Sequence, residues 1–195
     1  MKNKRRMIAA ILTLAMLAVS LGAPAFAEDL NVNIRLQAKS EAWVGDVLGV
    51  QVMLDFEDVI AERGGIFTAF CVLKYDPAIM EPIAPETLQP VIRNEAGEIV
   101  EGKYGILGDI LTDTSLSVKH ATDDDALVLL YGDMDSTDIL ASGTLVSLAF
   151  RIHQDLELPT GAKSAALQVL RPSVSGREVV SDGQGGETTH VVNFN

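Results

Sequence analysis

From residue 30 onward, the chain is a series of short apolar runs separated by Gly, Asp, Asn and Pro. Runs of this length, bounded by turn-forming residues, are typical of β-strands joined by short loops. The clearest examples are residues 31–36, 47–54, 66–75 and 144–152. Long helical periodicity is absent. About nine such strands, without repeats or a linker, predict an all-β protein built as a β-sandwich.

Two segments depart from this pattern. In residues 79–113, three prolines interrupt weak strands, and residues 94–97 have the composition of a hairpin tip, so we expect a flap here. Ser136 and Thr137 can cap a short helical turn that ends at Leu140. Residues 165–170 and 190–194 are predicted as the last two strands, on either side of the Gly-rich loop 182–186.

Residues 1–27 are predicted to be a secretory signal peptide. Four basic residues precede an apolar run that ends in Ala25-Phe26-Ala27, a small-x-small cleavage site. The alternative is a single membrane-anchoring helix, which the acidic Glu28 and Asp29 disfavour. Cleavage leaves residues 28–195 as one domain of ordinary size. We therefore expect a secreted, extracellular protein that is free of the membrane once the signal has been removed.

The remaining chain is strongly acidic. Without the four basic residues of the signal peptide, 11 Lys and Arg face 27 Asp and Glu, a formal charge of −16. A surface of this charge repels nucleic acids and anionic membranes, so neither is expected as a partner. The one cysteine, Cys71, has no partner for an internal disulfide, and its apolar neighbours predict a buried, inert thiol.

The sequence contains no recognisable catalytic or metal-binding motif. His120, His153 and His190 are scattered, and no HExxH, GxSxG, P-loop or paired-Cys pattern occurs. Residues 133–144 resemble a calcium loop only superficially, because Asp138 and Thr144 replace the Gly and Glu that an EF-hand needs. We expect a protein that is not an enzyme and that holds no cofactor or metal of its own.

Two predicted strands are apolar on both faces. In the stretch GGIFTAFCVLKYDP (residues 64–77), Ala69, Cys71, Leu73 and Tyr75 alternate toward the core, which places Phe70 and Val72 outside. Residues 126–132 repeat the pattern, with Val128 and Leu130 outside. A contiguous apolar surface of this kind marks a partner-binding site. The alternative is that the flap folds over this surface and buries it.

Four stretches resemble, in their order and spacing, the pattern of bacterial cohesin modules. They are VGDVLGVQVML, GGIFTAFCVLKYDPAIMEPI, ALVLLYGDMDS and GTLVSLAFRI, and the resemblance spans residues 30–195. It implies a nine-stranded jelly-roll β-sandwich of the type found in the scaffoldins of cellulosomes. It also implies a monomeric, non-catalytic module that binds dockerin-bearing polysaccharide-degrading enzymes or scaffold proteins, with calcium held by the dockerin.

The resemblance further implies which residues face the dockerin. They are the outward residues of four strands of one sheet: Thr68, Phe70, Val72 and Lys74 on the third strand; Ser115, Ser117 and Lys119 on the fifth; Val128, Leu130, Gly132 and Asp133 on the sixth; and Leu145, Ser147 and Ala149 on the eighth. The segment 81–113 has no counterpart in the resemblance.

A carbohydrate-binding or cell-surface adhesion sandwich is the alternative function. Such modules grip sugar rings on exposed aromatic platforms. Aromatic residues make up only 5% of this chain, and Trp43 is expected to pack under the edge of a strand. An aromatic-poor apolar face favours a protein partner over a sugar.

Overall fold

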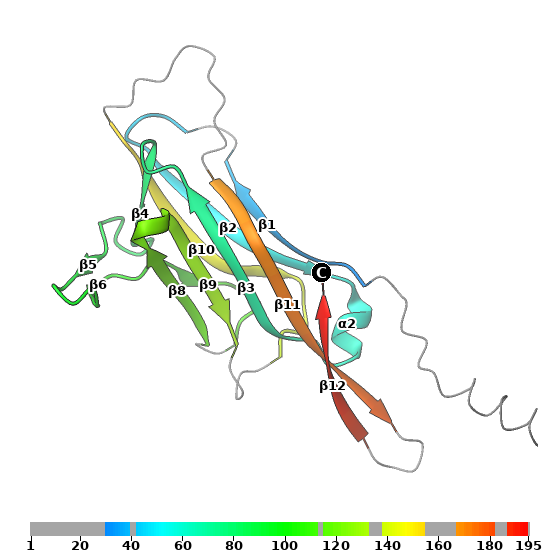
Figure 1. The fold of residues 1–195 in the computed structure, drawn as a ribbon. Helices are drawn as coiled ribbons and strands as arrows, with labels where there is room; N and C mark the ends of the chain where they lie inside the picture. Colours follow the sequence, from blue (N-terminus) through cyan, green and yellow to red (C-terminus); the bar gives the residue numbers. More distant parts are fainter. Residues whose placement is uncertain are drawn as a thin grey trace, which may run out of the picture.

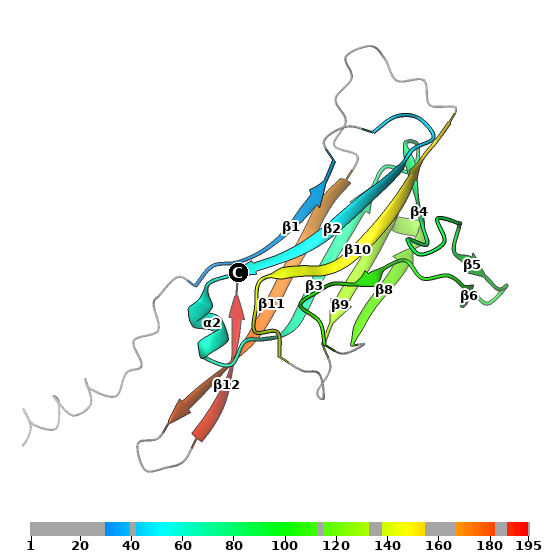
Figure 2. The same ribbon diagram turned by 180° about the vertical axis from the view of Figure 1, so that it is seen from behind.

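In the computed structural model, the chain forms two β-sheets that face one another. The structure describes residues 30–39, 42–112, 115–132, 138–154, 167–181 and 187–194. The first sheet has the strand order β1-β2-β10-β4, with β7 also paired to β10, and the second has the order β12-β11-β3-β9-β8. Figures 1 and 2 show the two layers from opposite sides. The predicted all-β sandwich is confirmed.

The described residues contain twelve strands and two short helical elements. They are β1 (Val32–Ala38), β2 (Val47–Phe56), α2 (Asp58–Glu62), β3 (Ile66–Tyr75), β4 (Met80–Ile83), β5 (Ile92–Arg93), β6 (Ile99–Glu101), β7 (Ile106–Leu107), β8 (Leu116–Ala121), the 3-10 turn Thr122–Asp124, β9 (Ala126–Tyr131), β10 (Gly143–Ile152), β11 (Leu167–Ser181) and β12 (Glu187–Phe194). The sequence predicts about nine strands, and the short strands β5, β6 and β7 lie in the predicted flap.

The core lies between the sheets and follows the alternation of the strands. Val52 and Phe150 from the first sheet meet Leu73 and Leu129 from the second, and none of these side chains is measurably exposed to solvent. The predicted inward residues of β3 are all buried, including Cys71, and burial raises the pKa of its thiol to about 12. The prediction of a buried thiol is therefore confirmed, and a raised pKa disfavours the reactive thiolate.

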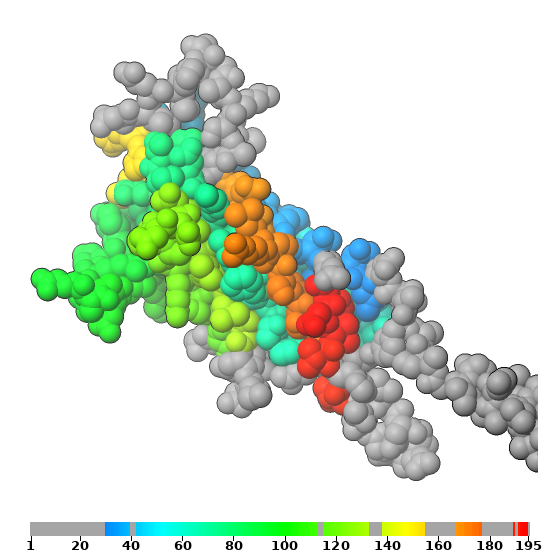
Figure 3. Space-filling view, viewed as in Figure 1, coloured from blue at the N-terminus to red at the C-terminus, as the bar shows by residue number. Residues whose placement is uncertain are grey.

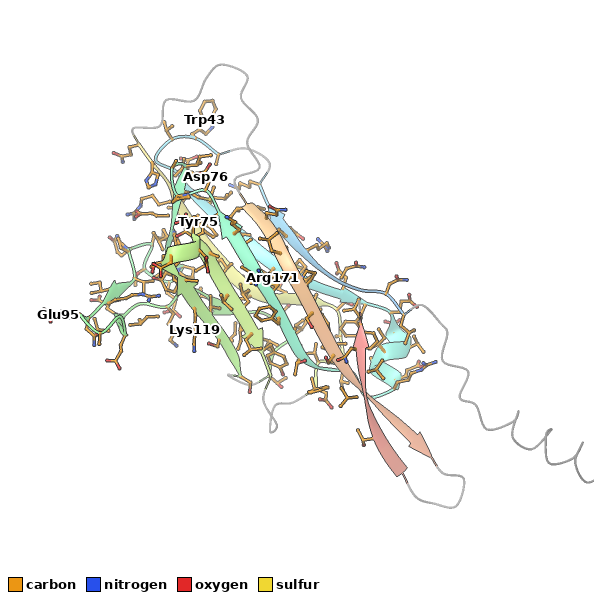
Figure 4. The ribbon with its side chains drawn as sticks, viewed as in Figure 1. Trp43, Tyr75, Asp76, Glu95, Lys119 and Arg171 are labelled. Atoms are coloured by element: carbon orange, nitrogen blue, oxygen red, sulfur yellow. The ribbon has the colours of Figure 1, made fainter. Side chains whose placement is uncertain are left out.

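The flap closes one side of the sandwich and leaves the outer face of the second sheet open. β4 and β7 pair with β10 of the first sheet, and β5 pairs only with β6 in a small hairpin. This hairpin projects sideways beyond β8, with Glu95 at its tip (Figures 1 and 4). In the space-filling view, β3, β9 and β11 lie at the surface beside the flap (Figure 3). The alternative in which the flap covers this face is wrong.

The predicted signal peptide, helical turn and last two strands differ in how far the structure describes them. The signal peptide lies outside the described residues, as do Ser136 and Thr137 of the helical turn, and Ile139 instead forms a β-bridge with Ile66. The last two strands exist but are longer than predicted. In the described part of the chain, no helix is long and apolar enough to span a membrane.

A polar network under the flap joins elements that are far apart in the sequence. Tyr75 Oη lies 2.6 Å from His120 Nε2, and Tyr104 Oη lies 3.3 Å from His120 Nδ1. Arg93 donates to the hydroxyl of Tyr104 and to the backbone carbonyl of His120. Burial raises the pKa of Tyr75 to about 12, and the nearby Asp125 carboxylate adds to this shift. The network ties the flap to β3 and β8.

This network predicts that acid weakens the fold. Burial lowers the pKa of His120 and the neighbouring Arg93 cation lowers it further, while Asp125 opposes the shift. The unfolded chain then takes up a proton near pH 6.5, where the folded chain does not, so stability falls as the pH drops below that value. Urea unfolding at pH 7 and pH 5 should show this loss. In His120→Gln, which has no imidazole to titrate, the loss should be smaller, and equal losses would contradict the assignment.

Candidate protein-docking face

The centre of the second sheet carries a compact apolar block on its outer surface. β3 and β9 are antiparallel, and their register sets Phe70 directly opposite Leu130 and Val72 directly opposite Val128. Side chains opposite one another on adjacent strands lie in contact across the sheet. The four apolar side chains that the sequence placed outside the core therefore form one continuous surface, which we call the apolar block.

The exposure of these side chains follows the predicted two-faced character of the strands. Leu130 is 45% exposed, whereas its neighbours Leu129 and Tyr131 are buried. Phe70, Val72 and Val128 are half-buried, in part because each packs beside the others on the sheet. The assignment of inward and outward residues on β3 and β9 is thus confirmed.

The polar residues predicted for this face surround the apolar block on β3 and β8. On β8, Ser117 is paired with Leu130 and Lys119 with Val128. Ten of the fourteen predicted residues belong to these strands or adjoin them, and they are Thr68, Phe70, Val72, Lys74, Ser115, Ser117, Lys119, Val128, Leu130 and Gly132. We call this set the docking face. Asp133 lies outside the described residues.

The three residues predicted on the eighth strand do not belong to this face. Leu145, Ser147 and Ala149 lie on β10, which is paired with β2, β4 and β7 in the opposite sheet. Leu145 and Ala149 are buried. A bulge between Thr144 and Val146 shifts the register of β10 at this point. Alternation showed which β10 residues face the core but could not show to which sheet the strand belongs.

β11 occupies the position that had been expected for this strand. It is antiparallel to β3, with Leu170 opposite Val72 and Ser173 opposite Phe70. The intervening Arg171 and Pro172 form a bulge in which Arg171 has a φ of 51°. Both bulge residues are exposed. The sequence reasoning missed these residues, because it ended the strand at Leu170, just before the bulge.

Three exposed basic side chains lie around the apolar block, and the acidic turn of Asp123, Asp124 and Asp125 lies where β8 meets β9. Lys74 on β3 and Lys119 on β8 are exposed, and so is Arg171 on β11. Figure 4 shows Lys119 and Arg171 on strands at either side of β3 and β9. Lysine and arginine side chains beside an apolar centre favour a partner surface that combines apolar and acidic side chains.

Gly132 follows β9 at one end of the docking face, where the backbone passes close to β3. Its φ is 106°, and a Cβ at this position would lie 2.2 Å from the carbonyl oxygen of Phe67. A side chain here requires both backbone strain and displacement of β3.

Gly132→Ala is therefore expected to destabilise the fold by about 2 kcal/mol or more. Thermal melting measures the effect. Gly49→Ala is the matched control, since Gly49 lies in β2 with no positive φ and nothing within 4 Å of the added methyl. The close approach is refuted if both variants melt alike.

Among the described residues, no group of three or more His, Cys, Asp or Glu could hold a metal ion.

The expected packing of Trp43 under a strand edge is wrong. Its side chain is 77% exposed on the turn before β2, and Figure 4 shows it at the end of the sandwich, away from β9. What the described chain presents is an apolar sheet surface bordered by polar and charged side chains.

The fold and this surface define a β-sandwich in which no described element covers the outer face of the second sheet. No family model matches the chain, and no curated protein matches it. Solved structures do, and their fold is that of cohesin modules. The chain thus has the cohesin fold, as the sequence stretches had indicated.

Three structures illustrate the likeness. The seventh ScaB type I cohesin from Pseudobacteroides cellulosolvens is 17% identical to this chain, with a TM-score of 0.51. The match covers 81% of this chain and 83% of the cohesin. The OlpC cohesin in a type I cohesin–dockerin complex from Clostridium thermocellum is 16% identical with a TM-score of 0.51, covering 77% and 86%. The type II cohesin A11 from Bacteroides cellulosolvens is 13% identical with a TM-score of 0.50, covering 74% and 85%.

Proposed function

We propose that this protein is a secreted, non-catalytic module that binds dockerin-bearing proteins through the docking face. The observation that carries the proposal is the apolar block, which lies at the centre of a sheet face that no described element covers, in a protein with the cohesin fold. The structures of similar fold include a cohesin in complex with a dockerin, which supports a partner of this kind. The partners would be polysaccharide-degrading enzymes or scaffold proteins.

Binding would be driven by removal of the apolar block from water. At about 25 cal/mol per Å² of apolar area, burial of a few such side chains contributes several kcal/mol. Interfaces of this kind concentrate their energy in a few central, fully desolvated residues. Leu130 and Phe70 are directly opposite each other and form the natural centre of the contact.

The charged rim would select the partner and speed its approach. Lys74 and Lys119 border the apolar block on two strands, and exposed rim charges act on the association rate and on discrimination more than on affinity. A dockerin with acidic residues around an apolar helix face is therefore the expected ligand. Its association rate should fall as salt is added, because screening weakens the attraction.

Carbohydrate binding is the second candidate, and the exposed Trp43 is the observation that favours it. Val44 and Val47 beside it are also exposed. A single indole ring can stack on one sugar face, whereas Phe70 is the one aromatic residue of the docking face and is half-buried. This site would lie at the end of the sandwich, apart from the docking face.

One experiment separates the two candidates. Residues 28–195 would be titrated against a panel of dockerins in the presence of calcium, and insoluble polysaccharides would be tested in parallel. We expect saturable binding to at least one dockerin and no retention on the polysaccharides. Retention on a polysaccharide without binding to any dockerin would reverse the assignment, and Trp43→Ala would then be expected to abolish it.

A further inference from the structure

The outer edge of β8 is an unpaired strand edge within the described structure. β8 ends the strand order of the second sheet, so only one of its sides is paired, to β9. The backbone carbonyl of Ser115 accepts a hydrogen bond from Gly132 beyond the end of β9, whereas that of His120 accepts from Arg93 of the flap. Backbone groups alternate in direction along a strand. The N–H and C=O groups of Leu116 and Val118 therefore point outward, away from β9.

A groove of about 650 Å³ lies against this part of the edge. Its apolar walls come from the flap and from β8 itself and consist of Ile99, Val100, Ile106, Leu107, Leu116 and Val118. The four flap residues are between 39% and 61% exposed. We call this the edge groove. Exposed strand edges are normally blunted or covered, and here the flap hydrogen-bonds to the edge at His120.

Unpaired backbone groups beside apolar walls are the features that bind an extended peptide as an added strand. Main-chain hydrogen bonds then supply affinity, and pockets for alternate side chains supply specificity. A strand laid along Leu116 and Val118 would direct every second side chain into the edge groove. The side chains between them would point toward the docking face, beside Ser117 and Lys119.

The charge around the edge groove identifies the kind of peptide that fits. Residues 81–109 contain six acidic and two basic side chains, and Glu86 and Glu101 line the groove itself against the single cation Lys103. The whole chain is acidic, so a second copy of it would be repelled. A peptide with basic flanks would be attracted.

We propose that the free edge of β8 and the edge groove bind an extended peptide that has alternating apolar side chains and basic ends. This site uses the outward backbone groups of Leu116 and Val118 and the apolar walls of the edge groove, whereas the docking face uses the side chains of Ser117 and Lys119 on the same strand. It would allow the protein to hold a peptide segment of a second protein while the docking face is occupied.

The test uses residues 28–195 and a fluorescent nine-residue peptide, with lysine at both ends and valine and threonine alternating between them. We expect saturable binding by fluorescence anisotropy and slower hydrogen exchange at the Leu116 and Val118 amides. The same peptide with methylated valine and threonine nitrogens cannot donate to β8 and should bind at least tenfold more weakly. Equal binding of the two peptides, or unchanged exchange at both amides, would overturn the proposal.

Two variants locate the site. Val118→Pro removes an outward N–H at a position where an edge strand tolerates proline, and Val100→Ser removes an exposed apolar wall. Each variant should weaken peptide binding at least threefold and leave dockerin binding unchanged. Val47→Ser, on the opposite sheet, should change neither peptide binding nor dockerin binding. If Val118→Pro unfolds, the proposal is tested instead by hydrogen exchange at the Leu116 and Val118 amides of the unaltered protein with the peptide bound. A dimer in sedimentation that Val118→Pro dissociates would show that a second copy occupies the edge, contrary to the proposal.

Discussion

Leu130→Asp is expected to weaken dockerin binding by about 100-fold, which corresponds to about 2.7 kcal/mol. Leu130 is the most exposed member of the apolar block and lies directly opposite Phe70. An aspartate there would have to lose its hydration on binding without a compensating partner. The folded protein should tolerate it, since the side chain already borders water. Isothermal titration with a dockerin that binds the unaltered protein measures the change.

Val47→Asp is the matched control for this prediction. Val47 is 39% exposed and points outward from β2, in the other sheet. The substitution adds the same charge to the same kind of strand position, so it should cost similar stability and leave dockerin affinity unchanged. Loss of affinity in Val47→Asp alone would place the dockerin on the first sheet. An unaltered affinity in Leu130→Asp would remove the apolar block from the interface.

Leu129→Ala is expected to have the opposite consequence, with a large loss of stability and no loss of affinity in the folded protein. Leu129 has no measurable exposure and packs in the core cluster shared by the two sheets. Truncation removes buried methyl groups and leaves a cavity, at a cost of about 3 kcal/mol. For a chain of this size, that lowers the melting temperature by about 10 °C. Scanning calorimetry provides the measurement.

Leu130→Ala is the control on the adjacent residue, which points to the opposite face of the same strand. Its melting temperature should stay close to that of the unaltered protein. The two alanine variants together test the face assignment without reference to any partner. Equal destabilisation by both would mean that β9 is buried on both sides and that no docking face exists there.

The sequence was sufficient to predict the β-sandwich and the outward residues of β3 and β9, but not which strands lie next to one another. Alternation in residues 66–75 and 126–131 correctly separated buried from outward side chains, because successive residues on a strand must point to opposite faces. Turn residues located most strand ends. Neither signal carries information about which strands become neighbours.

The error at β10 shows this limit. Val146, Leu148, Phe150 and Ile152 were correctly predicted to share one face, and all are buried. The same alternation would arise in either sheet, since both sheets bury one face against the other. Pairing is decided by contacts between residues distant in the chain, such as Leu170 with Val72, and by the bulge at Arg171.

Local sequence patterns were sufficient to predict a β-sandwich, the buried face of several strands, and the apolar side chains on the outside of two of them. Those properties depend on local periodicity and composition. The folded structure was needed to show that β11 flanks β3, that His120 lies between Tyr75 and Tyr104, and that the flap leaves the docking face open. Each depends on which distant segments meet, a choice made by the packing of the whole chain.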